Sequence, residues 1–167
     1  LNPSNGKGSV TVSSYTPVGK TIYVSQNGND SNTGLAENYP KRTIKNASGI
    51  ASSGDTIKVF PGVYIEDNPI IIPDNVSVVG AGLRSCIIRP LNANKDLFRV
   101  RNGCYFTEFT FRDGVSGSTP TFTWNYAVSY DDPEDITTSR SGYTYLPTTK
   151  PLITQSPYVQ NCSIISF

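Results

Sequence analysis

The sequence predicts an all-β solenoid, a chain that winds through short stacked strands, and three observations favour this class. Short apolar segments rich in β-branched residues recur along the chain, and such residues suit the half-buried surface of a strand. Proline, glycine and asparagine separate these segments, as tight corners require. No segment has the length and 3.6-residue period of a long helix. The pattern is clearest between Gly54 and Val79, with strands expected at 56–60, 70–72 and 76–79 and corners at 61–62 and 73–75.

A short helix is expected to cover the first coil of this solenoid. A segment of four or five apolar residues cannot bury itself, so each coil is stabilised by its neighbours and the end coil needs a cover. Pro40 near the start and Gly54 just past the end match the usual asymmetry of a helix. The apolar positions that share one helical face are Ile44, Ala47, Ile50 and Ala51.

The chain divides into a leading segment and one solenoid domain. Residues 1–20 are rich in small and polar residues, which is typical of a linker or the end of a preceding domain. The domain is expected at 21–167, with a cap at 21–54, coils at 55–113 and 151–167, and an insertion at 114–150. The chain starts at Leu1 and stops within an apolar strand, so we expect an excerpt of a longer polypeptide, truncated at the C-terminus, whose apolar end other protein covers.

Composition argues against several partners. The net charge is +1, from 14 basic and 13 acidic residues, and no basic stripe alternates with aromatics, so no nucleic-acid partner is expected. No long apolar run and no basic amphipathic helix is visible, so no membrane partner is expected. Cys86, Cys104 and Cys162 lack metal-like spacing and are expected to be small buried residues, with a disulfide between two of them left open.

The order YVSQNGNDSNTG, followed by YPKRTIKNASGIASSGDTIKVFPGVYIE, resembles the N-terminal cap and first coil of right-handed parallel β-helix proteins of the pectate-lyase-like superfamily. The resemblance covers residues 21–113 and implies a right-handed parallel β-helix with a short N-terminal capping helix. The later segments SVVGAG, NGCYFTEFTFRDG and ITQSPYVQNCSIISF are similar to the β-helix of tail or baseplate proteins of tailed phages, including those of marine cyanobacteria. Such a likeness does not establish a function by itself.

Carboxylate chemistry is the main enzymatic alternative, because the chain has no histidine to act as a general base. Many β-helix proteins cleave polysaccharides with paired carboxylates, or with Ca²⁺ and a basic residue. The candidate catalytic residues are Glu108 and Asp113, with Arg112 as the cation; Glu108 is expected to point outward from a strand at 104–111. Solvated surface charge is the favoured reading of all three.

No cofactor is expected, and a metal site has only weak support. The segment from Asp30 to Gly34 resembles the first positions of a Ca²⁺ loop, with Asp30 and Asn32 as candidate ligands, but it lacks one ligand and the distal glutamate. Turn chemistry is therefore favoured over metal binding at these residues.

The expected insertion carries five aromatic residues that suit an interface. Subunit or partner contact is favoured for them, with plain packing and glycan binding as alternatives. They are Trp124, Tyr126, Tyr130, Tyr143 and Tyr145.

These observations favour a non-enzymatic role. We expect a structural or adhesive segment of a virion tail, baseplate or fibre protein, a homotrimer that contacts other virion proteins, with a host surface glycan as a further candidate partner. Such a protein is assembled in the host cytoplasm and is extracellular when mature. The alternatives are a polysaccharide lyase or glycoside hydrolase that degrades a host glycan, and a non-catalytic carbohydrate-binding module.

Overall fold

The computed structural model describes residues 19–92, 95–100, 102–112, 127–129 and 157–165. It contains one helix and twelve short strands in this part of the chain, and the strands form three sheets, which we name A, B and C. Sheet A contains β1 (Thr21–Val24), β2 (Thr56–Val59), β5 (Ser77–Val79), β8 (Tyr105–Thr107) and β11 (Tyr158–Gln160). Sheet B contains β3 (Gly62–Glu66), β6 (Cys86–Pro90), β9 (Thr110–Arg112) and β12 (Ser163–Ile165). Sheet C contains β4 (Ile70–Ile71), β7 (Phe98–Arg99) and β10 (Val128–Ser129), and the helix α1 spans Ile44–Ile50.

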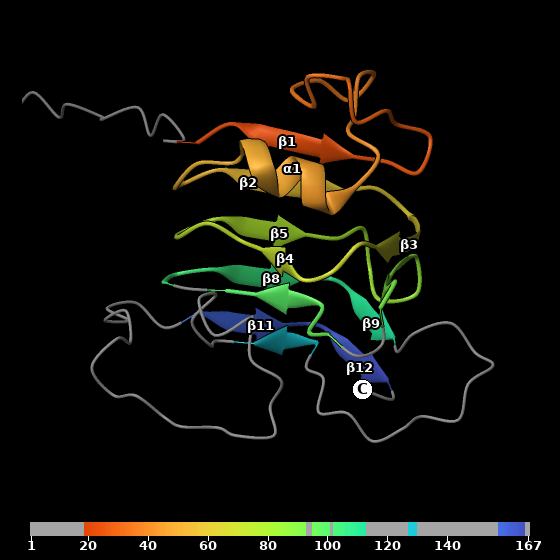
Figure 1. Ribbon diagram of the computed structural model, residues 1–167, viewed down its shortest axis with the longest axis vertical. Coiled ribbons are helices and arrows are strands. Elements are labelled where there is room, and N and C mark those ends of the chain that lie inside the picture. Colours follow the sequence, from red (N-terminus) through yellow and green to blue (C-terminus); the bar gives the residue numbers. More distant parts are fainter. Residues whose placement is uncertain (1–18, 93–94, 101, 113–126, 130–156, 166–167) are drawn as a thin grey trace, which may run out of the picture.

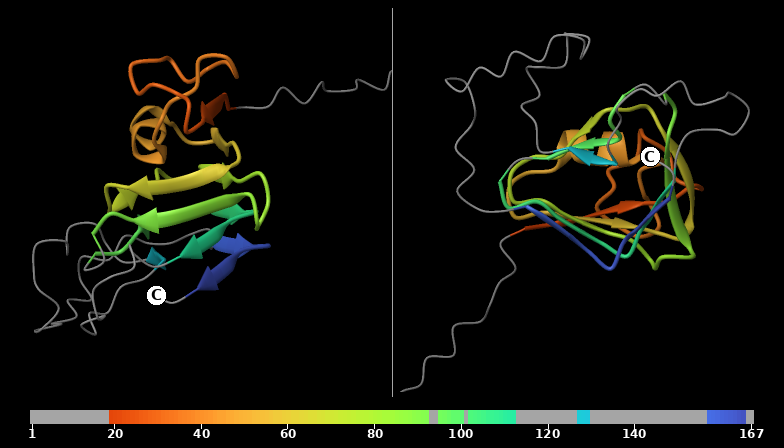
Figure 2. Two further views of the ribbon diagram at one scale, coloured as in Figure 1. Left: turned by 90° about the vertical axis from the view of Figure 1, so that its right-hand side faces the viewer. Right: turned by 90° about the horizontal axis from the view of Figure 1, so that it is seen from below.

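Every strand pair in these sheets is parallel, and each sheet gains one strand per coil as the chain winds. The coils lie one above another in Figure 1, and the end view in Figure 2 shows the sheets around a common interior. This is the arrangement of a parallel β-helix, so the predicted all-β fold with parallel stacked strands and one short helix is confirmed.

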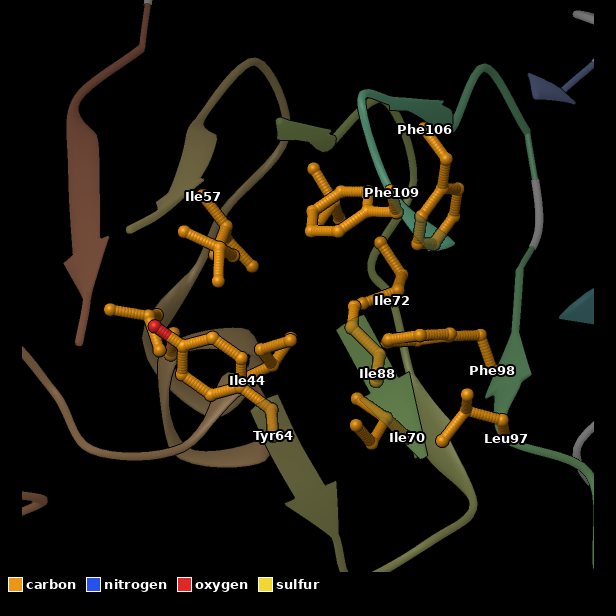
Figure 3. Close-up of a cluster of buried hydrophobic side chains, with 14 of the residues drawn as sticks. Ile44, Ile57, Tyr64, Ile70, Ile72, Ile88, Leu97, Phe98, Phe106 and Phe109 are labelled. Carbon is orange, nitrogen blue, oxygen red and sulfur yellow. The ribbon is translucent and has the colours of Figure 1, made fainter. Parts of the chain in front are cut away.

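The core is a set of inward columns, because side chains alternate along each strand and successive strands are in register. In sheet A, Ile22, Ile57, Val78 and Phe106 follow one another and are at most 1% exposed. Four phenylalanines fill the lower coils, with the Phe98 ring 5.0 Å from that of Phe106. Figure 3 shows these side chains from the three sheets converging on one interior.

Two kinds of corner set the direction of the chain. Gly54, Asn75 and Gly103 each have a positive φ, and each lies two residues before a strand of sheet A. Asn and Gly are the residues that adopt this left-handed conformation most readily. The other kind joins sheet A to sheet B at Glu108 and Asn161, whose φ angles are 65° and 48°. The backbone N–H of Glu108 donates to the Asn161 carbonyl, so these corners also stack.

The second kind of corner corrects one predicted strand. Residues 104–111 were expected as one alternating strand, but Glu108 divides them into β8 in sheet A and β9 in sheet B, and Asn161 separates β11 from β12 in the same way. The predicted corner at Pro61-Gly62 is also shorter than expected, because β3 begins at Gly62. At Glu108 the left-handed turn leaves the apolar side chains of Phe106 and Phe109 buried on either side of it. Hydrophobic alternation alone therefore does not reveal this turn.

Within the range expected as an insertion, 114–150, residues Val128–Ser129 form a strand of the winding. Val128 and Ser129, inside that range, pair in register with Phe98 and Arg99 as β10. Ala127 and Ser129 are 4% and 3% exposed, as residues of a packed coil should be. This stretch was missed because two residues are too few to show a period.

The helix and the cysteines follow their predictions except at Ile50 and Cys162. In α1, Ile44, Ala47 and Ser48 are buried, whereas Ile50, which was expected on the inner face, is 39% exposed. Cys86 and Cys104 are buried, Cys162 is half-buried, and all three are free thiols.

Candidate functional site

The N-terminal end of the β-helix is closed over all three sheets, and this cap is the most elaborate polar structure in the described residues. Above sheet A, the N–H of Tyr23 donates to the Gly34 carbonyl and the N–H of Lys41 donates to the Tyr23 carbonyl. Above sheet B, the Gln26 side-chain amide donates to the Val63 carbonyl. Above sheet C, α1 takes the place of a strand, and its Ser48 hydroxyl donates to the carbonyl of Ile71. The edge of each sheet at this end therefore has at least one hydrogen bond from the cap.

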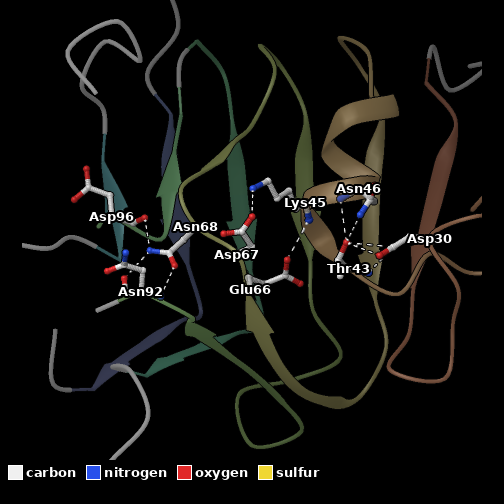
Figure 4. Close-up of polar contacts among 9 residues, drawn as sticks. All are labelled: Asp30, Thr43, Lys45, Asn46, Glu66, Asp67, Asn68, Asn92 and Asp96. Atoms are coloured by element: carbon white, nitrogen blue, oxygen red, sulfur yellow. Dashed lines mark hydrogen bonds and ion pairs between the residues drawn. The ribbon is translucent and has the colours of Figure 1, made fainter. Parts of the chain in front are cut away.

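Two carboxylates outside α1 bind the backbone N–H groups at the start of the helix (Figure 4). Asp30 Oδ1 accepts from the N–H groups of Arg42 and Thr43, both at 2.9 Å. The carboxylate of Glu66, at the end of β3, accepts from Ile44 at 2.8 Å and from Lys45 at 3.2 Å. Because the first N–H groups of a helix have no partner within it, these contacts satisfy groups that burial would otherwise penalise.

Glu66 is the most deeply buried carboxylate of the cap, with a relative exposure of 1%. Burial raises its pKa, and the N–H groups of Ile44 and Lys45 only partly offset that effect. A buried carboxyl with a raised pKa is a common sign of catalysis. Here its two oxygens are occupied by the helix backbone, so its role in this geometry is to hold α1 on the first coil.

A second buried polar group, Asn68, lies at the corner between sheets B and C. Its side-chain Nδ2 donates to the carbonyls of Asn92, Lys95 and Asp96 at 2.9, 2.9 and 3.0 Å. Its Oδ1 accepts from the Asn92 N–H at 2.8 Å. Asn68 therefore organises the same corner of the next coil (Figure 4), a role that sequence reasoning missed.

The structure does not bring the candidate catalytic residues together. Glu108 occupies a corner, not a strand, and its Oε1 accepts from the Asn161 side-chain amide at 3.2 Å. Arg112 is an exposed residue of β9, and no ion pair joins it to Glu108. Asp113 lies outside the described residues.

The candidate metal ligands serve the cap. Asp30 accepts backbone hydrogen bonds at the start of α1, and the Asn32 amide donates to the Pro40 carbonyl at 2.9 Å. Within the part of the chain that the structure describes, no group of three or more His, Cys, Asp or Glu side chains could hold a metal ion. Both residues therefore bind backbone groups 8 to 13 residues further along the chain, rather than the neighbouring groups of a local turn.

The five aromatic residues predicted at an interface, Trp124, Tyr126, Tyr130, Tyr143 and Tyr145, lie outside the described residues. The described chain has a different exposed aromatic pair on the outer face of sheet A. Tyr105 and Tyr158 are in register on β8 and β11, with ring centroids 4.8 Å apart. The Tyr105 hydroxyl donates to the Gln160 side chain at 2.8 Å, and Tyr158 is 57% exposed.

The outer face of sheet B carries apolar side chains where a solvated sheet would carry polar ones. We call Val63, Ile65, Ile87 and Leu91 the lateral patch. Val63 and Ile65 are 44% and 51% exposed, and Leu91 is 62% exposed. Val63 is in register with Ile87, and Ile65 is in register with Arg89, so an arginine lies beside the patch.

Comparison with known proteins supports the fold and leaves the activity open. Residues 26–88 match a family described as protein of unknown function (DUF1565), which is usually linked to β-helix proteins. The match covers the capping loop, α1 and the chain from β2 into β6. No curated protein and no solved structure matches the chain significantly. In the described residues, no helix has the length and apolar character needed to cross a membrane.

Proposed function

We propose that this chain is a non-catalytic structural or adhesive segment that contacts other protein through the side of its β-helix. The observation that carries this proposal is the lateral patch, where β-branched side chains that would suit a core point outward from β3. Exposed apolar side chains gathered on one face, with an arginine beside them, are typical of protein interaction surfaces. The closed N-terminal end directs such contact to the flank.

The setting we propose is a virion tail, baseplate or fibre protein, and the partner is further copies of the chain in a homotrimer, together with other virion proteins. This setting comes from the likeness of the later segments to phage tail proteins. The use of the described cap carboxylates in structural contacts fits it, because Asp30 and Glu66 bind backbone N–H groups and Asp67 pairs with Lys45.

The test is the mass of the full chain in solution, measured by light scattering after size exclusion. A trimer is expected for the unchanged protein. Ile65→Lys places a charge in the lateral patch and should yield monomers, whereas Thr56→Lys, on the outer face of sheet A, should leave the trimer intact. Transient complexes have dissociation constants in the micromolar range, so a biological trimer should be present when the chain is at about 100 μM. If the unchanged protein is a monomer at that concentration, the assembly role is refuted.

One observation favours a second candidate, carbohydrate binding. An exposed tyrosine held by a neighbouring ring, with a glutamine amide alongside, suits stacking against a sugar. Tyr158→Ala should then abolish binding of a glycan in titration. The enzymatic alternative requires release of reducing ends or unsaturated uronates from host glycans, and loss of that release in Glu108→Ala.

A further inference from the structure

The helix α1 has little to hold it together by itself. It contains seven residues and has no acidic residue in its first turn. Helices shorter than roughly 12–15 residues are marginal in water, because nucleation is costly. The sequence also contains Gly49 within the helix, which lowers its propensity. The stability of α1 must therefore come from contacts outside the helix.

The hydrogen bonds among those contacts are concentrated at one end, where charged carboxylates accept them. The apolar inner face offers only Ile44 and Ala47, with Ser48 bound to the carbonyl of Ile71. At the N-terminal end, four consecutive backbone N–H groups, from Arg42 to Lys45, are bound by Asp30 and Glu66. Within the helix itself, the Thr43 hydroxyl accepts from the N–H of Asn46 at 3.1 Å.

The two carboxylates reach this point from opposite directions. Asp30 belongs to the loop above β1, and Glu66 belongs to the end of β3 in the first coil. The start of α1 is therefore the junction between the capping loop and the body of the β-helix. Hydrogen bonds to charged groups contribute more than neutral ones, so the charge of each carboxylate matters at this junction.

We propose that residues 25–53, the cap, open and close as one unit on a β-helix that stays folded. Glu66 holds this unit closed, and Asp30 ties the capping loop to α1 within it. Opening separates the capping loop from Tyr23 and removes α1 from Ile71. The upper edges of sheets A, B and C are then free to pair with another chain.

Hydrogen–deuterium exchange of the full chain, read by mass spectrometry, tests this proposal. In Glu66→Gln one of the two accepting oxygens becomes an NH₂ group that faces a backbone N–H. Exchange in 44–51 should accelerate by about tenfold or more, the ratio that corresponds to about 1.4 kcal/mol. Peptides from β6 and β9 should keep the exchange rates of the unchanged protein.

Asp67→Asn is the matched control. Asp67 is the next residue, carries the same charge and also contacts α1, but it pairs with the Lys45 ammonium and not with backbone N–H groups. Removal of the Asp67 charge should leave the exchange rate of residues 44–51 within about threefold of that of the unchanged protein, because exposed ion pairs are weak.

Three results would overturn the proposal. Unchanged exchange in Glu66→Gln would show that Glu66 does not hold the cap. Equal acceleration in the cap and in β6 would show that the cap does not open separately. If Glu66→Gln fails to fold, the unchanged protein in sub-denaturing urea supplies the test. Residues 44–51 should then open at lower urea than β6 and β9, and simultaneous opening would refute the proposal.

Discussion

Asn68 offers the sharpest test of how one coil organises the next. The side chain is 2% exposed, and its Nδ2 lies against three carbonyl oxygens. Because Nδ2 carries two hydrogens, these three contacts amount to two hydrogen bonds, one of them shared. The Asn92 N–H bound to Oδ1 supplies a third. At about 1 kcal/mol net for each bond, Asn68→Ala should lower the free energy of unfolding by about 3 kcal/mol.

Asn68→Asp should cost more than Asn68→Ala at pH 7, although its shape is closer to the native side chain. It replaces the donor with a carboxylate oxygen that faces the carbonyls of Asn92, Lys95 and Asp96, and a buried charge without donors is strongly unfavourable.

Urea unfolding followed by circular dichroism measures the loss of unfolding free energy in both variants. The melting temperature of the alanine variant should fall by roughly 6–12 °C. Asn27→Asp, in an exposed turn, is the control and should lie within about 0.5 kcal/mol of the unchanged protein. If Asn68→Asp were as stable as the unchanged protein, the carbonyl-facing group would not be a donor, and the reasoning would fail.

Two further predictions concern the core and the first corner. Phe98→Ala should lower the free energy of unfolding by about 3–5 kcal/mol, because the ring is fully buried against Phe106 and Phe111; Phe98→Leu should cost less, and an alanine loss below about 1 kcal/mol would contradict the packing. For Asp55, burial alone would raise the pKa. The N–H groups of Ser52 and Lys20 and the Lys20 ammonium outweigh burial and lower it. This lowered pKa contributes stability that is present above the unfolded value of about 3.9 and is lost as pH falls through the folded value. Urea unfolding from pH 6 to pH 3 should therefore show a smaller acid loss in Asp55→Asn than in the unchanged protein, and equal losses would contradict the assignment.

Much of the winding could be predicted because it depends on local patterns. The alternating residues of β2 and the Asn75 corner are visible as apolar and turn-forming residues, and they lie where the sequence placed them. The left-handed conformation of Glu108 was not predictable in this way, because glutamate is an uncommon residue at positive φ.

The site residues were harder to predict because their partners are far away in sequence. Glu66 binds backbone N–H groups 21 and 22 residues away, and Asn68 binds carbonyls 24 to 28 residues away. Nothing local marks an acidic or amide side chain as a long-range cap. The contacts of Glu66 with α1 depend on how the first coil lies against the cap, which the sequence alone does not show.

The left-handed corner before each strand of sheet A has a consequence for how such a chain can change. The left-handed residue of each corner sets the direction of the backbone for the sheet A strand that follows, whatever the length of the connection before it. These residues are Gly54, Asn75 and Gly103. Extra residues between two corners can therefore accumulate on the flank without shifting the strands that follow. A foreign peptide placed in the 80–85 connection, where the matching corner at 108–109 needs only two residues, should be carried as a side loop. Because the left-handed residues form a column, the length of the stack depends on the number of coils and not on the length of the connections between them.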